Sequence, residues 1–258
     1  MDTNSRIRGT AAAVTGARHL RAARNGQDAA AVWIGDDAGA VVVCDGCGSG
    51  GSSEVGARLG ARLVIAALGR RLAAGASPVC RDMWESVRVE VIGVLEDLVR
   101  AAVGEGDAAA RAAFIEEHLL FTIVAAAVCG GEAAVWALGD GAYAVAAQTR
   151  ELGPFTDNQP PYLAYDLLGV SMGAEHEVID ATTAGAVVIA TDGAAEVGLD
   201  VFGIESCLAH PDALRRRLTV LARGAETIDW GARRVIRRPA TLQDDGAVAI
   251  LAWRGRSS

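Results

Sequence analysis

The sequence predicts an α+β fold in which an antiparallel β-sandwich is flanked on both sides by helical layers. Three observations support this prediction. Short apolar segments follow one another across turns too short for crossover helices, and long amphipathic segments occur in pairs. The strict strand–helix alternation of a parallel doubly wound sheet is also absent. The chain has 258 residues, is 51% hydrophobic and lacks a Pro- or Ser-rich linker, so we expect a single domain over residues 1–258.

The first half of the chain is predicted to form three strands and then helices. The strands are expected over residues 7–15, 29–34 and 40–44, with a polar, basic loop over 16–28. The second and third strands should form a hairpin across the turn at 36–39, which would place Asp28 and Asp45 at the same end. Three helical segments are then expected, at about 52–73, 81–103 and 108–117.

The second half is predicted to return to strands. A meander is expected from segments 119–128, 133–138 and 142–148, and an irregular, flap-like excursion over about 153–180. An apolar strand at 186–190 precedes three helical segments, at about 194–209, 211–222 and 226–237, and a last strand covers 247–253.

Bulk properties narrow the class of protein. A net charge of −8 disfavours nucleic-acid binding, and the arginine runs at 215–217, 233–234 and 237–238 are interpreted as solvated faces. The N-terminus has no signal-peptide core and no apolar stretch is long enough to span a membrane, so we expect a cytoplasmic protein without membrane contact. An odd number of cysteines, five, fits reduced thiols.

Acidic residues recur at the predicted strand ends. The buried strand Val41–Cys44 runs into Asp45-Gly46, and comparable contexts hold Asp28, Asp140, Asp192 and Asp244. An isolated Asp-Gly is usually a turn. Five such carboxylates gathered at one sheet edge would repel each other, and a divalent cation with oxygen ligands is the usual compensation. The pattern therefore predicts a metal centre.

The ordered set of motifs resembles the metal-dependent Ser/Thr phosphatases of the protein phosphatase 2C (PP2C, or PPM) class in a compact bacterial form. The resemblance spans nearly the whole chain and rests on five segments: Asn25-Gly26-Gln27-Asp28-Ala29, Val43-Cys44-Asp45-Gly46-Cys47-Gly48-Ser49, Leu138-Gly139-Asp140-Gly141, Ala190-Thr191-Asp192-Gly193 and Asp244-Asp245-Gly246-Ala247-Val248.

The resemblance implies roles for these residues. Asp45 would bridge two Mg²⁺ or Mn²⁺ ions, with the Gly46 carbonyl on one of them and Asp192 and Asp244 on the other. Asp28 would act through a bound water, which makes Asp28, Asp45, Asp192 and Asp244 the catalytic set, and Asp140 with Asp192 matches the position of a third ion. Hydrolysis of phosphoserine or phosphothreonine would then proceed by attack of a water or hydroxide that bridges the two metals.

The implied partners are a phosphorylated protein and its cognate Ser/Thr kinase. The family often places an arginine before the first aspartate to hold the phosphate; the candidates here are Arg21, which we favour, Arg24 and His19. The excursion at 153–180 takes the place of the family's variable flap, which helps to set substrate choice.

Two other functions fit parts of the pattern. A catalytically silent phosphatase-like module would keep the fold and bind a phosphoprotein or regulatory partner, consistent with the unplaced phosphate ligand. A redox protein would use Cys44 and Cys47, which have the C-x-x-C spacing, although they are also explained as incidental small residues at a strand end.

Overall fold

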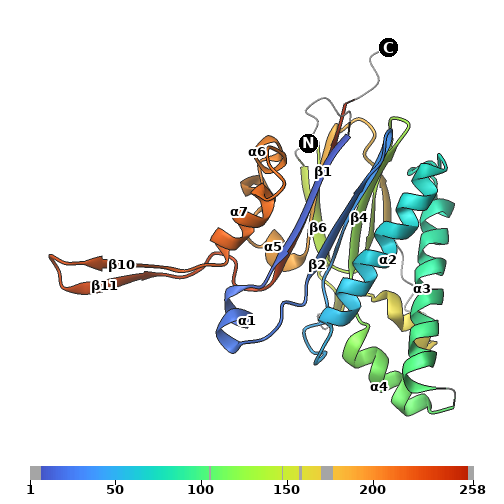
Figure 1. Ribbon diagram of the computed structural model, residues 1–258, viewed down its shortest axis with the longest axis horizontal. Coiled ribbons are helices and arrows are strands. Elements are labelled where there is room, and N and C mark those ends of the chain that lie inside the picture. The colour runs from blue at the N-terminus through green and yellow to red at the C-terminus, as the bar shows by residue number, and fades with distance from the viewer. Residues whose placement is uncertain (1–6, 105, 147, 157–158, 170–176, 255–258) are drawn as a thin grey trace.

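The computed structural model describes residues 7–254 apart from 105, 147, 157–158 and 170–176. Two five-stranded antiparallel sheets stack face to face (Figure 1). In spatial order, the first sheet contains β1 (Ile7–Val14), β12 (Gly246–Trp253), β9 (Ala186–Ala190), β6 (Gly141–Val145) and β7 (Gln148–Leu152). The second contains β2 (Ala29–Ile34), β3 (Ala38–Cys44), β4 (Ile123–Cys129), β5 (Glu132–Leu138) and β8 (Glu177–Asp180).

Alternation along the central strands builds three apolar layers. In β3, Val41 and Val43 face the opposite sheet, whereas Val42 and Cys44 face the helices, as the two-residue period of a strand requires. Strand β12 is buried along its whole length because an apolar layer covers each of its faces. Leu251 lies between the sheets and Ile250 lies under the other helical layer.

The helical layers differ in size. The second sheet is covered by α2 (Glu54–Ala73), α3 (Arg81–Val103) and α4 (Ala108–His118), and Trp84 of α3 stacks on Trp136 of β5 with ring centroids 5.6 Å apart. The first sheet is covered by the shorter α5 (Asp192–Ala195), α6 (Ile204–Leu208) and α7 (Ala213–Leu221), with the 3₁₀ turn η3 (Leu199–Val201) between α5 and α6. The predicted sandwich with helices on both sides is confirmed (Figure 1).

Several local predictions are wrong. Residues 16–28 were expected to be a loop, yet α1 (Ala17–Ala22) forms there; it begins where Gly16 donates its backbone N–H to the Asp245 side chain. The meander is also incorrect, because β5 and β6 belong to different sheets, and the single strand expected at 142–148 is divided into β6 and β7, which pair as a hairpin.

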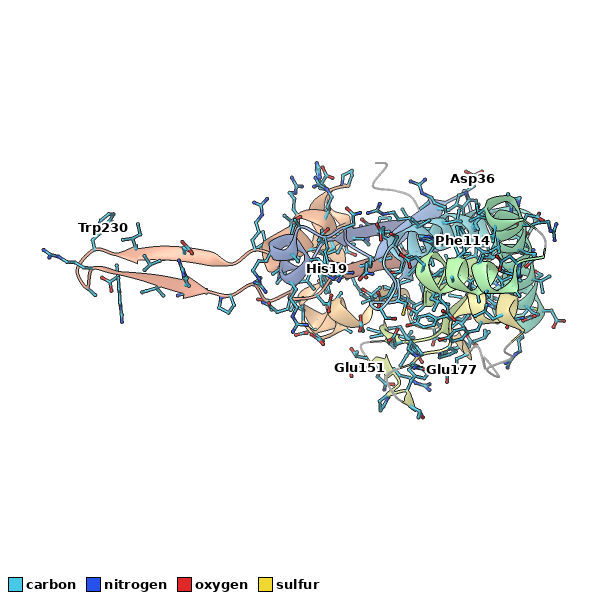
Figure 2. The ribbon with its side chains drawn as sticks, turned by 90° about the horizontal axis from the view of Figure 1, so that it is seen from below. His19, Asp36, Phe114, Glu151, Glu177 and Trp230 are labelled. Atoms are coloured by element: carbon cyan, nitrogen blue, oxygen red, sulfur yellow. The ribbon has the colours of Figure 1, made fainter. Side chains whose placement is uncertain are left out.

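The excursion at about 153–180 is only partly irregular: its described residues include a 3₁₀ turn, η2 (Leu163–Leu168), and β8, while 157–158 and 170–176 lie outside the described part. The largest error concerns residues 226–237. Instead of a helix they form β10 (Ala225–Asp229) and β11 (Arg234–Arg238), a two-stranded hairpin that projects from the body (Figures 1 and 2). Its β-branched residues at 227, 228, 235 and 236 favour strands over helix.

Candidate metal centre

The strand register gathers all five predicted aspartates at one end of the sandwich. Ala29 pairs with Cys44, which places Asp28 beside Asp45 in the second sheet, as predicted from the hairpin. In the first sheet, Ala190 pairs with both Ala142 and Val248. The strand ends that carry Asp140, Asp192 and Asp244 therefore lie side by side at the same edge of the sheet.

A cavity of about 370 Å³ opens between these strand ends. All five aspartates and Gly46 line it, whereas Arg21, Arg24 and His19 do not. The described residues that form its wall include no Lys or Arg; the remaining members are Gln27, Cys47, Gly48, Ser49, Pro160, Tyr162 and Asp245. The wall is thus acidic and has no cationic side chain to compensate its charge.

Burial and the charges of neighbouring carboxylates disfavour ionisation of three carboxyls of the wall, those of Asp28, Asp45 and Asp140. Burial raises the pKa of Asp28 to about 7, opposed by the hydrogen bond that Thr191 Oγ1 donates to Asp28 Oδ2 at 2.5 Å. Burial, followed by the charge of Asp28, also raises the pKa of Asp45 well above its ordinary value. For Asp140, burial and then the charge of Asp192 raise the pKa to about 6. An ion held between these groups would relieve both penalties.

The donor set fits a hard divalent cation. Carboxylate and carbonyl oxygens are the ligands that Mg²⁺ and Mn²⁺ prefer. Asp140 Oδ1 is buried and makes no hydrogen bond, although buried polar atoms in native proteins nearly always have a partner. An unpartnered carboxylate oxygen in the wall of an acidic cavity is explained if it ligates a cation.

Glycines permit the tight approach of the strand ends. A Cβ on Gly193, directly after Asp192, would lie 2.2 Å from the Asp245 carbonyl oxygen, so only glycine allows the start of α5 to approach the residues before β12 this closely. Gly141, directly after Asp140, has a φ of 122°, a backbone conformation that other residues rarely adopt. These Asp-Gly dipeptides therefore serve the packing of the strand ends as well as the site.

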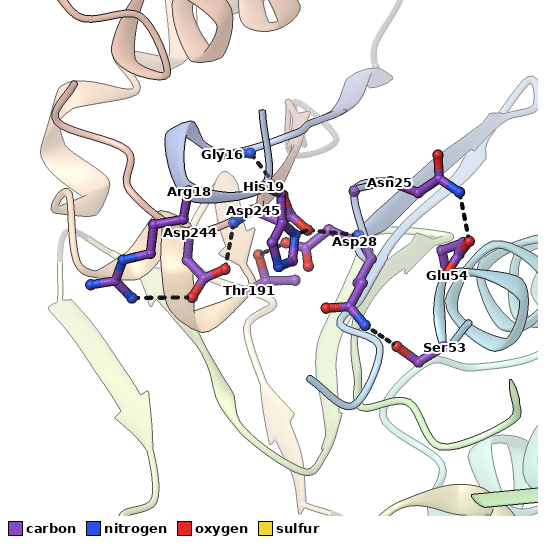
Figure 3. A network of polar contacts seen from close by, with 12 residues as sticks. Gly16, Arg18, His19, Asn25, Asp28, Ser53, Glu54, Thr191, Asp244 and Asp245 are labelled. Atoms are coloured by element: carbon purple, nitrogen blue, oxygen red, sulfur yellow. Dashed lines mark hydrogen bonds and ion pairs between the residues drawn. The ribbon is translucent and has the colours of Figure 1, made fainter. Parts of the chain in front are cut away.

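The family resemblance marks Asp244 as the ligand and Asp245 as its non-ligand neighbour, but it does not predict the structural role of Asp245. Its carboxylate is buried and accepts hydrogen bonds from three groups: Gly16 N at 2.7 Å, Gln27 N at 2.7 Å and His19 Nδ1 at 2.6 Å (Figure 3). It thereby ties the segment between β1 and β2 to the start of β12. The adjacent Asp244 is exposed, lines the cavity and accepts a hydrogen bond from Asp245 N at 2.9 Å.

His19, Asp244 and Asp245 also bring one possible ligand atom each within 4.8 Å of one another. Two hydrogen bonds from backbone N–H groups already occupy the Asp245 carboxylate, so a cation there would compete with the contacts that hold the fold. We therefore assign Asp245 and His19 to the scaffold.

The phosphate-ligand candidates lie outside the cavity wall. His19 is held by Asp245, Arg21 is exposed with its guanidinium 3.3 Å from the Gln243 side-chain oxygen, and Arg24 is exposed after α1. The arginine that sequence reasoning missed is Arg18, whose Nη1 lies 3.8 Å from Asp244 Oδ2 (Figure 3). Its place beside Asp244 depends on helix α1, which the sequence did not predict.

The two cysteines of the C-x-x-C segment have different surroundings. Cys44 is fully buried under the helices, and burial raises the pKa of its thiol well above the ordinary value. Cys47 lines the cavity; hydrogen bonds from Ser49 and Tyr162 lower its pKa against the opposing effect of burial. Because redox pairs need an accessible thiolate, a buried and protonated Cys44 argues against the redox interpretation.

The model of the protein phosphatase 2C family matches residues 15–229 of the chain. The chain belongs to the protein phosphatase 2C family. Four of the five aspartates lie within the match, and Asp244 lies beyond its end. The search of curated proteins finds no significant match.

Solved structures of this family have the same fold at low sequence identity. The catalytic domain of the serine/threonine phosphatase PstP, in complex with two manganese ions, has a TM-score of 0.55 and 14% identity, and the alignment covers 95% of this chain and 97% of that one. Stp1 from Staphylococcus aureus has a TM-score of 0.56, 13% identity and coverages of 99% and 98%. A bacterial serine phosphatase has a TM-score of 0.54, 15% identity and coverages of 97% and 99%.

Proposed function

We propose that this protein phosphatase 2C family member is a Mg²⁺- or Mn²⁺-dependent phosphatase that hydrolyses phosphoserine and phosphothreonine in proteins. The observation that carries the proposal is the cavity wall: six aspartates converge on it, five of them the predicted ones from five strand ends, and its described residues include no Lys or Arg. The manganese complex of the structurally similar PstP domain supports the choice of metal.

The aspartates of the wall and Gly46 have proposed parts. Asp45 and the Gly46 carbonyl, with Asp28, Asp192 and Asp244, would hold two divalent ions, and Asp140 with Asp192 would hold a third. When bound, such ions lower the pKa of water and neutralise the charge of a transferring phosphoryl group. Thr191 holds the Asp28 carboxylate in place by its hydrogen bond, and Asp245 anchors the backbone beside Asp244.

Arg18 replaces Arg21, Arg24 and His19 as our candidate for contact with the substrate phosphate. It is exposed and lies at the rim of the cavity beside Asp244, where its guanidinium could turn toward a bound anion. We expect Arg18→Ala to raise KM for a phosphopeptide more than it lowers kcat, whereas Arg24→Ala leaves both unchanged. Equal effects of the two substitutions would contradict this placement.

The activity is tested with p-nitrophenyl phosphate and a phosphothreonine peptide. Hydrolysis should require Mn²⁺ or Mg²⁺, stop in EDTA, and fall by about 100-fold or more in Asp192→Asn, because several kcal/mol of charge stabilisation is lost. Asp36→Asn, in the exposed turn between β2 and β3, is the matched control and should retain full activity. Turnover that persists in EDTA or in Asp192→Asn would sink the proposal.

A silent binding module is the second candidate, favoured by the absence of any Lys or Arg from the described cavity wall. It predicts calorimetric Mn²⁺ binding without turnover of any phosphopeptide. Robust turnover would remove it. The phosphoprotein substrate, the cognate Ser/Thr kinase and the cytoplasmic location remain predictions; within the described part of the chain, no helix is both long and apolar enough to cross a membrane.

A further inference from the structure

The hairpin β10–β11 is an exposed arm. We define the arm as residues 223–238, which comprise the two five-residue strands, the turn at 230–233 and the two residues before β10. Every one of these residues is exposed except Asp229, which is half-buried. Figures 1 and 2 show the arm extending away from the sandwich, with Trp230 near its tip.

The arm is held by contacts within itself. Arg237 Nε lies 2.8 Å from Glu226 Oε1, and Arg234 Nε lies 3.5 Å from Asp229 Oδ2, each across the two strands. Exposed ion pairs of this kind contribute at most about 1 kcal/mol each. A two-stranded hairpin alone in water is only marginally stable. A second surface that covers the arm would supply the missing stabilisation.

The side chains of the arm are of the kind that protein interfaces bury. Ile228 and Val235 lie opposite each other on one face and are 50% and 53% exposed. Trp230 is 80% exposed, more than any other large apolar residue in the described part of the chain. Trp and Arg dominate the residues that carry binding energy at protein interfaces, and clustered exposed apolar side chains mark such sites.

The charge of the arm selects its partner. Five arginines and two acidic residues give the arm a net charge of +3. Because the whole chain has a net charge of −8, the rest of the chain has a net charge of −11. The body of a second copy is therefore electrostatically complementary to the arm. Two arms paired edge to edge would instead bring like charges together. Complementarity favours an arm lying on a body over arm-to-arm pairing.

We propose that the partner is a second copy of this chain, and that the arm of each protomer lies against the acidic body of the other in a twofold dimer. Such an interface is isologous and is counted twice. Each protomer would contribute its arm and a receiving patch of similar size, which is close to the upper end of the roughly 20–30 residues a side of a stable interface. The exposed edges of β10 and β11 would also gain backbone partners or cover.

The arm can be removed without touching the cavity. Its two ends are held together, because Thr241 N and Leu242 N both bond the Leu221 carbonyl oxygen, so a short Gly-Ser loop can replace residues 225–238. None of the arm residues lines the cavity. The turn and β11 also lie beyond the end of the family match at residue 229.

The test is the molar mass in solution, measured by light scattering on a sizing column and by sedimentation, in EDTA and in Mn²⁺. The wild-type chain of 26.5 kDa is expected to elute as a dimer. Trp230→Ala should raise the dimer dissociation constant by about 30-fold or more, and the loop replacement should give a monomer. Added salt should weaken the dimer. Val220→Ser, on α7 and also well exposed, is the control and should remain dimeric.

Two outcomes overturn the proposal. The first is a wild-type chain that is monomeric at about 100 μM, a concentration at which even micromolar dimers form. The second is a dimer whose dissociation constant is unchanged by the loop replacement. The first would assign the arm to a different protein, and the second would place the interface elsewhere. Molar mass is read without any substrate, so this result is independent of the proposed phosphatase activity.

Discussion

The adjacent residues Asp244 and Asp245 should respond in opposite ways to the same substitution. Asp245 is 4% exposed and its carboxylate accepts hydrogen bonds from Gly16 N, Gln27 N and His19 Nδ1. In Asp245→Asn the amide oxygen can keep one backbone donor, and the amide NH₂ can donate to a His19 that changes tautomer. The second backbone N–H then faces a donor and is left buried without a partner.

The cost of Asp245→Asn follows from these contacts. An unsatisfied buried donor costs about 1–3 kcal/mol, and replacing a charge-assisted bond by a neutral one adds about 1 kcal/mol, for a total of about 2–4 kcal/mol. The Asp244 side chain is half exposed and accepts a single backbone bond, so Asp244→Asn should change the metal-free unfolding free energy by less than about 0.5 kcal/mol.

The assay is urea unfolding in EDTA, followed by far-ultraviolet circular dichroism. With an m value of about 3 kcal/mol/M for a chain of this size, Asp245→Asn should lower the midpoint by about 1 M, and Asp244→Asn should leave it unchanged. The order is opposite for phosphatase activity measured in Mn²⁺. There Asp244→Asn should have the larger effect, because it removes a proposed ligand. The reasoning is refuted if Asp245→Asn unfolds within 0.5 kcal/mol of the wild type, or if Asp244→Asn costs as much.

Three further outcomes are expected. In EDTA the unfolding free energy should fall as pH rises from 5 to 7, by up to about 1.4 kcal/mol per pH unit for each retained proton. The reason is that the pKa of Asp28 is raised to about 7 in the folded state, so its deprotonation disfavours that state. Asp28→Asn should flatten this dependence on pH, and an unchanged slope would contradict the prediction. Mn²⁺ at about 100 times its dissociation constant should stabilise the protein by about 2.7 kcal/mol and raise Tm by about 5–10 °C, an effect that Asp45→Asn removes in calorimetry. Gly193→Ala should lower Tm by several degrees, because its Cβ would meet the Asp245 carbonyl oxygen, whereas Gly93→Ala, with open space around it, should not.

The sandwich and the aspartate cluster could be predicted because their signals are local and repeated. The run Val41–Cys44 alternates between two apolar layers, and each Asp-Gly marks where a strand meets its neighbours. Hairpin pairing then places Asp28 beside Asp45 from sequence alone. The sheet to which β6 belongs could not be predicted in this way. The turn between β5 and β6 is short whether the two strands pair or lie in different sheets, so chain order does not distinguish a meander from a crossing between sheets.

The errors fall where tertiary contacts decide. The six residues of α1 are too few to form a stable helix alone, and they are held at Gly16 by a carboxylate 229 residues away. The role of Asp245 is hidden for the same reason, since its three donors come from segments that only the closed sandwich brings near. The arm was expected to be helical, although Thr227-Ile228 and Val235-Ile236, on either side of Trp230-Gly231, are signals for a hairpin.

Two dipeptides at the site divide their work between scaffold and cavity in the same way. Thr191 is buried, accepts a hydrogen bond from Ala247 N at 2.9 Å and donates to Asp28, whereas the next residue, Asp192, is exposed and lines the cavity. At residues 244 and 245 the order is reversed, with the exposed Asp244 first. Successive residues at a strand boundary point in different directions, so Thr191 and Asp245 fix the strand ends through their hydrogen bonds, whereas Asp192 and Asp244 present exposed carboxylates to the cavity. The positions of the Asp192 and Asp244 side chains are therefore set by the packing of their neighbours, so contacts of the protein alone hold these two carboxylates at the acidic cavity.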